Sequence, residues 1–391
     1  MKILINLDSI TSQKTGIGHY TAQLLNELLD DPRIEHIVGF KRDRLYTTPH
    51  ALRQQLDPAN NAAAEPNRLR KILQTLIKQS TFLSHLYRRL LSAYQARKIA
   101  PYAKQGYHYI EPNFIPVPYA GKTLPVIHDL SDLDCPQYHE TAKQRWFARH
   151  LPQAIHQAAR IITVSQYTKQ NIIQRFSLRP DQIDIVSPGV ADDFHAPTPE
   201  KINQICQQYR LKPNHYLLSV ATLEPRKNLK SLFHAWRQLE PALRQRYPLV
   251  LVGKNGWLNS ALEHEIQPYL TDRQIILTGY VPQHHLPALY AGARLFCYLS
   301  YYEGYGMPIA EALLCHAPIL ASNTTSMPEV AGDYATYVDP NNQSQINQTL
   351  RHLLTQPRAH PPPPPPPPPN YPWKAAAAPP YFAPTQGKKG G

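Results

Sequence analysis

The chain has 391 residues with a formal net charge of +13, and 42% of its residues are hydrophobic. This length suffices for two domains with separate cores, and the positive charge favours an anionic partner such as nucleic acid, a phospholipid surface or a phosphorylated ligand. The sequence argues against a signal peptide or a membrane-spanning helix, because the first apolar run is too short and no stretch approaches about 18 uninterrupted apolar residues. The four cysteines are widely spaced and form no CxxC pair, which indicates free thiols in a reducing cytosol.

Five short apolar runs in the first half of the chain are predicted to be strands, because helical segments separate them. Alternating strands and helices are typical of a parallel sheet covered by helices. Residues 1–186 are therefore predicted to form an N-terminal Rossmann-like domain. The five runs are Lys2–Leu7, His36–Phe40, Leu124–Ile127, Ile161–Ser165 and Ile183–Val186.

A glycine-rich turn follows the first predicted strand. Gly16 and Gly18 lie in the segment KTGIGHY, residues 14–20, which opens a helical segment. Glycine lets the backbone approach a phosphate or a sugar, and the amides at a helix N-terminus favour an anion. Because glycine turns between strands and helices are common, an ordinary structural turn is the alternative.

A basic amphipathic helix is predicted over about residues 67–98. This segment carries eight basic residues and no acidic residue, and apolar residues recur at near-helical spacing from Leu69 to Tyr94. Such a helix fits attachment to an anionic membrane surface. The alternative is a helix packed on its own domain with a solvated basic face. Nucleic-acid binding is disfavoured, because no recognition motif accompanies the charge.

His128 and Asp129 directly follow the predicted strand Leu124–Ile127. Ligands of α/β domains bind at this end of the strands. His128 is predicted to bond a sugar hydroxyl, and Asp129 to orient that histidine or to assist an acceptor hydroxyl. An ordinary polar loop is the alternative.

The second half of the chain contains six further predicted strands. Ten or more strands exceed one ordinary open sheet, so two sheets that face a cleft are predicted. The turn-rich residues 187–212 are interpreted as a linker, and residues 213–355 as a C-terminal nucleotide-sugar-binding domain. The six runs are Tyr216–Val220, Leu249–Gly253, Ile275–Thr278, Leu295–Leu299, Pro318–Ala321 and Thr336–Val338.

Two turns of the second half offer groups that suit a nucleotide. Arg226 and Lys227 precede a helical segment, where two adjacent cations would neutralise a leaving diphosphate; a solvated basic turn is the alternative. Tyr280 and Val281 lie in a turn whose backbone would read the edge of a nucleobase, although a plain strand end would look the same.

The segment from Glu303 to Glu311, EGYGMPIAE, is the most informative part of the chain. It follows an apolar strand, and Pro308 suits the first turn of a helix, where its missing N–H costs nothing. Glu303 is thus expected in a strand-to-helix loop and Glu311 about one turn into the helix, facing the same opening. Loop amides at a helix start favour a phosphate, and a carboxylate accepts hydrogen bonds from sugar hydroxyls. The pattern predicts a nucleotide-sugar site, against the alternative that two glutamates occur there by chance.

Together these segments resemble the retaining glycosyltransferases of family 4, which have the two-domain GT-B fold. The resemblance spans residues 2 to about 340. Its most specific parts are ATLEPRKNL, the segment from GYVPQ to MPIAEAL, and SMPEVAGDYATYVDP. Within the family, ATLEPRKN and the His-Asp loop look most like bacterial mannosyltransferases of surface-polysaccharide assembly.

The resemblance implies which residues would bind the donor diphosphate. Arg226 and Lys227 would contact it from the C-terminal domain. Thr222 stands in the same loop, where many relatives carry an arginine. Gly16 and Gly18 would approach the phosphate from the N-terminal domain.

The resemblance also implies which residues would bind the two sugars of the donor. Glu311 would hold the ribose hydroxyls, Glu303 would hold the transferred sugar, and His128 would lie near that sugar. Backbone amides of the loop would assist Glu303, and they belong to Gly304, Tyr305, Gly306 and Met307.

The predicted function is transfer of a hexose with retention, most simply mannose from GDP-mannose, in bacterial surface-polysaccharide synthesis. The acceptor is expected to be a glycan or a polyprenyl-diphosphate-linked sugar, and the enzyme is expected at the inner face of the cytoplasmic membrane. No metal or other cofactor is expected: Asp132 and Asp134 match the DxD metal motif of another glycosyltransferase architecture, but in a different strand context. A nucleotide-sugar epimerase of the same fold and a catalytically silent sugar-nucleotide or polysaccharide-binding subunit are the alternatives.

Residues 356–391 are predicted to be a proline-rich tail. Nine consecutive prolines, residues 361–369, exclude a helix and favour an extended polyproline conformation. The tail occupies the place of the helices that close the two domains in the family, so this sequence departs from the family pattern after Pro340.

Overall fold

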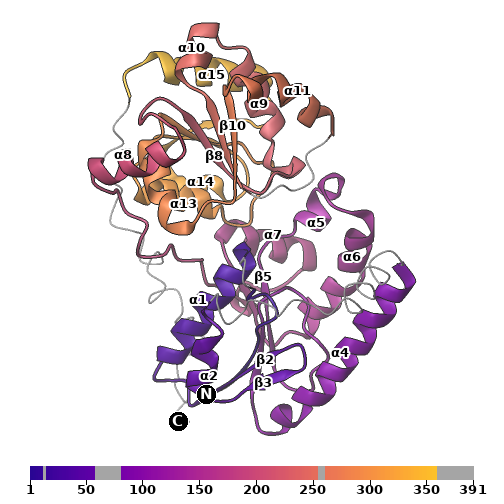
Figure 1. Cartoon of the computed structure of the whole chain (residues 1–391). Helices are drawn as coiled ribbons and strands as arrows, with labels where there is room; N and C mark the ends of the chain where they lie inside the picture. Colours follow the sequence, from indigo (N-terminus) through magenta and orange to yellow (C-terminus); the bar gives the residue numbers. More distant parts are fainter. Residues whose placement is uncertain (12–14, 58–80, 254–259, 359–391) are drawn as a thin grey trace, which may run out of the picture.

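The structure, a computed structural model, describes residues 1–11, 15–57, 81–253 and 260–358, with only the backbone described for residues 81–88, 260 and 261. These residues form two α/β domains, each with helices packed around a largely parallel sheet (Figure 1). The predicted fold class is therefore confirmed. The first sheet uses strands between Lys2 and Ile185, and the second uses strands between Leu217 and Val338.

The N-terminal sheet has seven strands in the order β3-β2-β1-β4-β5-β6-β7. Neighbours are parallel except β2 and β3, which form an antiparallel edge pair. Ile3 and Ile5 of β1 enter one core cluster and Leu4 enters another, so both faces of the sheet are buried. The sequence did not predict β3 and β4, because three or four residues carry little periodicity. The strands are β1 (Lys2–Asn6), β2 (His36–Lys41), β3 (Arg44–Tyr46), β4 (His108–Glu111), β5 (Thr123–Ile127), β6 (Ile161–Thr163) and β7 (Ile183–Ile185).

Helices of the N-terminal domain pack their apolar faces on this sheet. In α1, Leu24, Leu25 and Leu28 are buried at the spacing of one helical face, and Thr15 caps the helix by accepting from Gly18 N. The described helices of this domain are α1 (Gly16–Asp30), α2 (Pro49–Gln54), α4 (Thr81–Lys104), α5 (Ser131–Asp134), α6 (Thr141–Gln157) and α7 (Gln166–Phe176).

The C-terminal sheet has six strands, all parallel, in the order β10-β9-β8-β11-β12-β13. Alternate residues of β11 enter opposite cores: Leu295 and Cys297 lie on one face, Phe296 and Tyr298 on the other. The strands are β8 (Leu217–Val220), β9 (Leu249–Val252), β10 (Ile275–Gly279), β11 (Leu295–Tyr298), β12 (Ile319–Ser322) and β13 (Ala335–Val338). The helices are α8 (Pro199–Gln208), α9 (Leu229–Arg237), α10 (Pro241–Arg246), α11 (Ser260–Thr271), α12 (Leu286–Gly292), α13 (Met307–Leu314), α14 (Met327–Ala331) and α15 (Gln343–Thr355).

The segment interpreted as a linker, residues 187–212, is largely part of the second domain. Val190, Phe194, Ile205 and Cys206 are buried in the C-terminal core, with the last two on α8. Of the predicted tail, residues 359–391 lie outside the described residues. Arg358 donates from Nη2 to the carbonyls of Ala291 at 2.9 Å and Ala293 at 3.1 Å.

The predicted basic helix overlaps α4, and its residues 67–80 lie outside the described residues. Helix α4 continues beyond the predicted end, to Lys104. Within the described ranges, no helix is long and apolar enough to cross a membrane.

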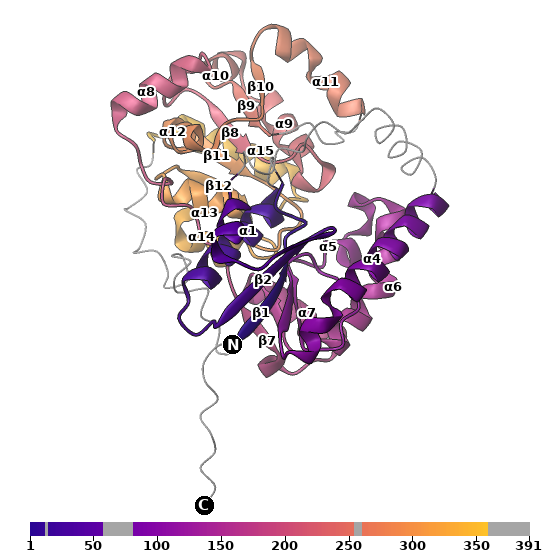
Figure 2. The same cartoon turned by 60° about the horizontal axis from the view of Figure 1, so that its bottom comes forward.

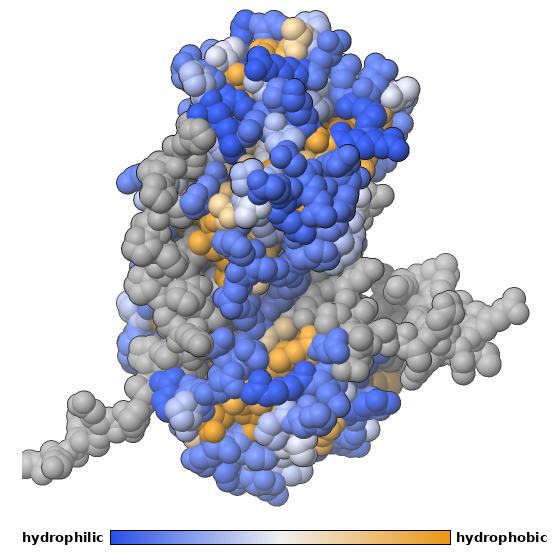
Figure 3. All heavy atoms as spheres, turned by 60° about the vertical axis from the view of Figure 1, so that its left-hand side comes forward, coloured by the Kyte–Doolittle hydropathy of each residue, from blue (hydrophilic) through white to orange (hydrophobic). Residues whose placement is uncertain are grey.

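The two domains contact each other at the carboxyl ends of their strands. In Figure 1, α5, α7 and the start of α1 face the C-terminal domain, and Figures 1 and 2 both show α10 and α11 on the far side of that domain. Ser165 and Thr168 donate from their hydroxyls to the carbonyl of Gly304 at 2.6 and 3.2 Å. Tyr305 packs against core clusters of both domains. Hydrophilic residues cover most of the face in Figure 3, since the large apolar side chains are gathered in the cores.

Candidate active site between the domains

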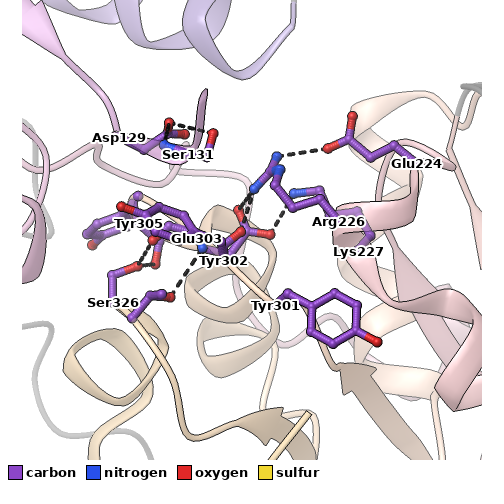
Figure 4. Close-up of polar contacts among 12 residues, drawn as sticks. Asp129, Ser131, Glu224, Arg226, Lys227, Tyr301, Tyr302, Glu303, Tyr305 and Ser326 are labelled. Atoms are coloured by element: carbon purple, nitrogen blue, oxygen red, sulfur yellow. Dashed lines mark hydrogen bonds and ion pairs between the residues drawn. The ribbon is translucent and has the colours of Figure 1, made fainter. Parts of the chain in front are cut away.

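Arg226, Lys227 and Glu303 meet beneath the surface at the domain boundary (Figure 4). Lys227 Nζ lies 2.6 Å from Glu303 Oε1, and Arg226 Nη1 lies 3.4 Å from Oε2. Tyr298 also donates its hydroxyl to Oε1 at 2.9 Å. The 3₁₀ turn η4 (Pro225–Lys227) supplies both cations, and the loop after β11 supplies the carboxylate. Two of the three most specific segments of the sequence are therefore brought into one charged cluster.

The charges of this cluster are coupled. Burial opposes ionisation of Glu303, but Lys227 and Arg226 outweigh burial and lower the pKa of Glu303 to about 2. Burial also disfavours the Arg226 cation, yet Glu303 and Asp129 raise the pKa of its guanidinium. Burial lowers the pKa of Lys227 even though Glu303 opposes this effect. Glu303 is thus a carboxylate at neutral pH.

One donor in the cluster has no acceptor. Among the described residues, the buried Arg226 Nε–H makes no hydrogen bond, whereas Nη2 donates to Glu224 Oε1 at 2.8 Å. A buried donor without an acceptor is costly. An oxygen atom of a bound ligand would satisfy it.

The loop between Glu303 and α13 is fixed by side chains that follow β12. Ser326 donates its hydroxyl to the carbonyls of Glu303 at 3.0 Å and Tyr305 at 2.8 Å, and Glu303 N donates to Thr325 Oγ1 at 3.2 Å. Gly306 has a φ of 102°, which favours glycine at this turn. Helix α13 then begins at Met307, so its N-terminal amides lie beside the charged cluster.

Glu311 lies one turn into α13, as predicted. Tyr290 of α12 donates its hydroxyl to Glu311 Oε2 at 2.8 Å. Burial raises the pKa of this carboxyl to about 7, and the charge of Asp193 adds to the effect. Glu311 therefore changes charge within the physiological pH range.

Replacing Glu311 with Gln should make the unliganded protein more stable at alkaline pH. The pKa is raised from 4.5 to about 7, so the folded state holds this proton more tightly than the unfolded chain, and the free energy of unfolding falls as pH rises through this window. The advantage of E311Q over wild type should grow by about 1 to 3 kcal/mol between pH 5 and pH 8. Urea titrations at both pH values measure it, with the exposed substitution Glu263→Gln as the control. An advantage that does not change with pH would contradict the assigned ionisation.

His128 is held at the end of β5. Its Nε2–H donates to the carbonyl of Pro112 at 2.8 Å, which leaves Nδ1 as an acceptor in the neutral ring. Burial lowers the pKa of His128, so the neutral form is favoured. The rings of Tyr20 and Phe114 contact it edge-on, with centroids at 5.0 and 5.6 Å. Nδ1 is therefore the atom that would accept a hydrogen bond from a sugar hydroxyl. That hydrogen bond stays a prediction.

The His-Asp loop lies directly against the glycine loop of the other domain. A Cβ at Gly304 would lie 2.0 Å from the backbone oxygen of His128 and 2.9 Å from Asp129 Cβ. Asp129 Oδ1 accepts from Ser131 N at 2.9 Å and Oγ at 2.8 Å. His128, Asp129 and Glu303 thus border one site.

The DxD residues have protein partners. Asp132 pairs with Lys143 at 3.0 Å and lies 3.4 Å from His139 Nδ1. Asp134 pairs with Arg175 at 2.8 Å. Within the described ranges, no group of three or more His, Cys, Asp or Glu residues is arranged to hold a metal ion.

The remaining predicted residues differ in their exposure. A Cβ at Gly16 would meet no atom within 4 Å, and Gly18 is buried in the first turn of α1. Thr222 is exposed after β8. Tyr280 is 63% exposed after β10, whereas Val281 is buried in the cluster that holds Tyr290, the partner of Glu311. The structure does not bring these residues into hydrogen-bond contact with Glu303.

Sequence reasoning assigned no role to several residues that contact the predicted site, among them Tyr290, Tyr298 and Ser326. Tyr290 and Tyr298 stand in apolar segments and read as core residues. Ser326 begins SMPEVAGDYATYVDP, a segment singled out for its resemblance only. The available signal was a tyrosine hydroxyl within an otherwise apolar run beside a motif, which indicates a polar partner.

Two family models match the chain, Glycosyltransferase Family 4 over residues 16–194 and Glycosyl transferases group 1 over residues 202–361. The chain is similar to O-antigen chain mannosyltransferase B of Escherichia coli, with 33% identity over 89% of this chain and 89% of that protein. A solved structure of WaaG, titled a glycosyltransferase involved in lipopolysaccharide biosynthesis, has a TM-score of 0.67 and 15% identity over 96% of this chain and 94% of its own. HepE of Anabaena, in complex with UDP and glucose, has a TM-score of 0.64 and 16% identity over 96% and 94% of the two chains.

The solved structures share the two-domain architecture, and the E. coli relative extends the similarity through both domains. The predicted resemblance is thereby confirmed. The chain belongs to the family 4 glycosyltransferases, enzymes of the GT-B fold.

Proposed function

We propose that this enzyme transfers mannose from GDP-mannose to a glycan or polyprenyl-diphosphate-linked sugar during bacterial surface-polysaccharide synthesis, with retention at the anomeric carbon and without a metal. The observation that carries the proposal is the buried Arg226–Lys227–Glu303 cluster at the domain boundary. The name of the E. coli relative supports mannose and a polysaccharide product.

In the proposed reaction, charge on the leaving diphosphate is stabilised by placed cations. Lys227, Arg226 and the N-terminal amides of α13 would face the diphosphate. The Arg226 Nε–H, which has no acceptor in the described part of the chain, would bond one of its oxygens. Glu303 would accept hydrogen bonds from hydroxyls of the transferred sugar. Its low pKa keeps it a carboxylate for this role.

Retention is proposed to follow from attack on the face that the diphosphate leaves. The acceptor oxygen forms a bond to the anomeric carbon as the bond from that carbon to the phosphate oxygen breaks. The proton of the acceptor hydroxyl passes to the departing phosphate oxygen. Neutral His128, with Nδ1 as an acceptor, would orient a hydroxyl of the transferred sugar.

The absence of a metal requirement is part of the proposal. Asp132 and Asp134 are engaged by Lys143 and Arg175 in ion pairs, and the cluster already provides two cations for the diphosphate. This arrangement favours charge stabilisation by side chains.

Peripheral attachment to the anionic inner face of the cytoplasmic membrane is proposed for the surface that carries α4. Leu90 is 62% and Tyr94 46% exposed, although both are large apolar side chains. Arg89 and Arg97 on the same helix are exposed, and Lys98 Nζ lies 5.3 Å from the Tyr94 ring centroid. Exposed apolar residues flanked by cations suit the boundary of an anionic bilayer, where a lipid-linked acceptor would reside.

A panel of nucleotide-sugars tests the proposed reaction, with and without a mannan acceptor and with and without EDTA. We expect GDP release from GDP-mannose that depends on the acceptor, and a product with the donor's anomeric configuration by NMR. Loss of turnover in EDTA would contradict the metal-free scheme. Conversion of the sugar without an acceptor would favour an epimerase, and binding without turnover of any donor would favour a silent binding subunit.

A further inference from the structure

Asp134 links α7 to the other domain. Its Oδ1 pairs with Arg175 Nη1 at 2.8 Å, and its Oδ2 accepts from the Tyr302 hydroxyl at 2.9 Å and from Asn171 Nδ2. Asn171 Nδ2 also lies 3.0 Å from that hydroxyl. Asp134 belongs to the DxD segment, so this segment contributes to the domain contact.

Tyr302 is buried and joined to both domains. It is 5% exposed, and its ring contacts the Tyr167 ring of α7 at a centroid distance of 6.0 Å. Burial and the charge of Asp134 raise the pKa of Tyr302, so the hydroxyl stays protonated and donates. Its own carbonyl accepts from Arg226 Nη1 at 2.5 Å. Tyr302 thus contacts the carboxylate of Asp134 in the N-terminal domain with its side chain. Its backbone carbonyl contacts the guanidinium of Arg226, which lies beside it in Figure 4.

The N-terminal domain holds both neighbours of Glu303. Asp134 binds the side chain of Tyr302, and Ser165 and Thr168 donate to the carbonyl of Gly304. Because the N-terminal domain also holds the two flanking residues, closure of the domains would constrain the Glu303 carboxylate in addition to the contacts from its own domain. The position of the Arg226 guanidinium depends on the same residues, because it donates to the carbonyl of Tyr302 and to Glu303.

A different inter-domain contact lacks this connection. Glu329 accepts from the backbone amides of Gln166 at 2.8 Å and Tyr167 at 3.0 Å. Among the described residues, its carboxylate forms no hydrogen bond or ion pair with the cluster of Arg226, Lys227 and Glu303. This second contact therefore joins the domains without a direct bond to the cluster.

We propose that Tyr302 is a positioning residue, which aligns Arg226 and Glu303 on the donor only when its hydroxyl is bonded to Asp134 in the closed enzyme. This assignment rests on the proposed function, because aligning Arg226 and Glu303 affects turnover only if the donor binds at these residues. Nucleotide binding to the C-terminal domain precedes this alignment, so Tyr302 acts on turnover more than on affinity.

Tyr302→Phe tests the proposal, with Tyr337→Phe as the matched control, because the Tyr337 hydroxyl bonds the surface carbonyl of Gly332. Y302F loses the hydrogen bond to the charged Asp134 carboxylate, so its kcat should be about 10- to 100-fold lower than that of wild type. The affinity for GDP by calorimetry should change less than about 3-fold, since Lys227 and the Arg226 charge remain. Y337F should match wild type in both measurements.

A double-mutant cycle separates alignment from a general loss of structure. Asp134→Ala should lower kcat like Y302F, and the double variant should be little worse than either single variant. Additive losses in kcat, or an unchanged kcat in Y302F, would overturn the assignment. The stability in urea of each variant is measured beside kcat, and a loss of kcat that tracks unfolding would also overturn it.

A readout without turnover distinguishes this inference from the proposed function. Small-angle scattering with GDP should show a compact wild-type enzyme and a more extended Y302F enzyme. If wild type transfers no sugar but shows this difference, the proposed function fails and the closure contact stands. If scattering and GDP affinity are the same in both proteins, the closure contact fails whatever reaction the enzyme performs.

Discussion

Replacing Lys227 with methionine should lower kcat/KM for sugar transfer by about 100- to 1,000-fold, the usual cost of removing one preorganised group that stabilises developing charge. Lys227 Nζ is held 3.2 Å from the Tyr298 hydroxyl and 2.6 Å from Glu303, so the ammonium is placed before a donor binds. Methionine keeps most of the apolar stem against Tyr298 and removes the charge. Steady-state kinetics with the donor identified in the nucleotide-sugar panel measure the loss.

Stability must be followed in the same Lys227→Met variant. Removing one partner of a buried ion pair typically costs about 3 to 5 kcal/mol, and the pKa of Glu303 should rise when its nearest cation is lost. Lys227→Arg keeps the charge and tests whether the position alone matters. Lys230→Met removes an exposed cation of the next helix and should leave the rate unchanged. A folded K227M enzyme with wild-type turnover would contradict the role given to Lys227.

Replacing Gly304 with alanine should reduce turnover by at least about 100-fold without unfolding either domain. The added Cβ would lie 2.0 Å from the His128 backbone oxygen, which belongs to the other domain and cannot move as a side-chain end can. Gly304 has no left-handed φ, so alanine is tolerated by the local backbone and the conflict arises only when the domains are in contact. The loss follows from misplacement of reacting groups by an ångström or more.

Two measurements identify the cause of the Gly304→Ala defect. Titration with GDP should give near wild-type affinity, because the C-terminal domain is unchanged, whereas scattering should show a larger radius of gyration than wild type. Gly16→Ala is the control for scattering, since its Cβ would meet no atom within 4 Å in this structure. A fully active G304A enzyme would show that the domain contact seen here is not the one in which transfer occurs.

The residues of the central cluster were predictable from sequence because each stands in a motif that follows a strand, and the strand order explains why they meet. Arg226 and Lys227 come after β8, Glu303 comes after β11, and these strands are neighbours in a parallel sheet. Their carboxyl ends therefore lie side by side. The sequence predicted that both segments follow strands of a parallel sheet, and the resemblance assigned both to the donor site. The adjacency of β8 and β11 comes from the structure.

The contacts across the cleft were not predictable in the same way. The bond from Asp134 to Tyr302 depends on how one domain sits on the other, and no local pattern encodes that geometry. The sequence analysis disfavoured a metal at the DxD match and gave Asp134 no other role, whereas the structure pairs it with Arg175 and Tyr302. The resemblance gave Glu311 a binding role but could not give its pKa. That pKa depends on how deeply the carboxyl is buried beside Tyr290 in the folded domain.

The position of the nucleotide diphosphate tests the account most directly. A crystal structure of the complex with GDP, grown in EDTA, should place the diphosphate between the domains, with its oxygens bonded to Lys227 and Arg226 and the ribose hydroxyls at Glu311. A diphosphate bound away from this cluster, while the Lys227–Glu303 pair stays intact, would contradict it.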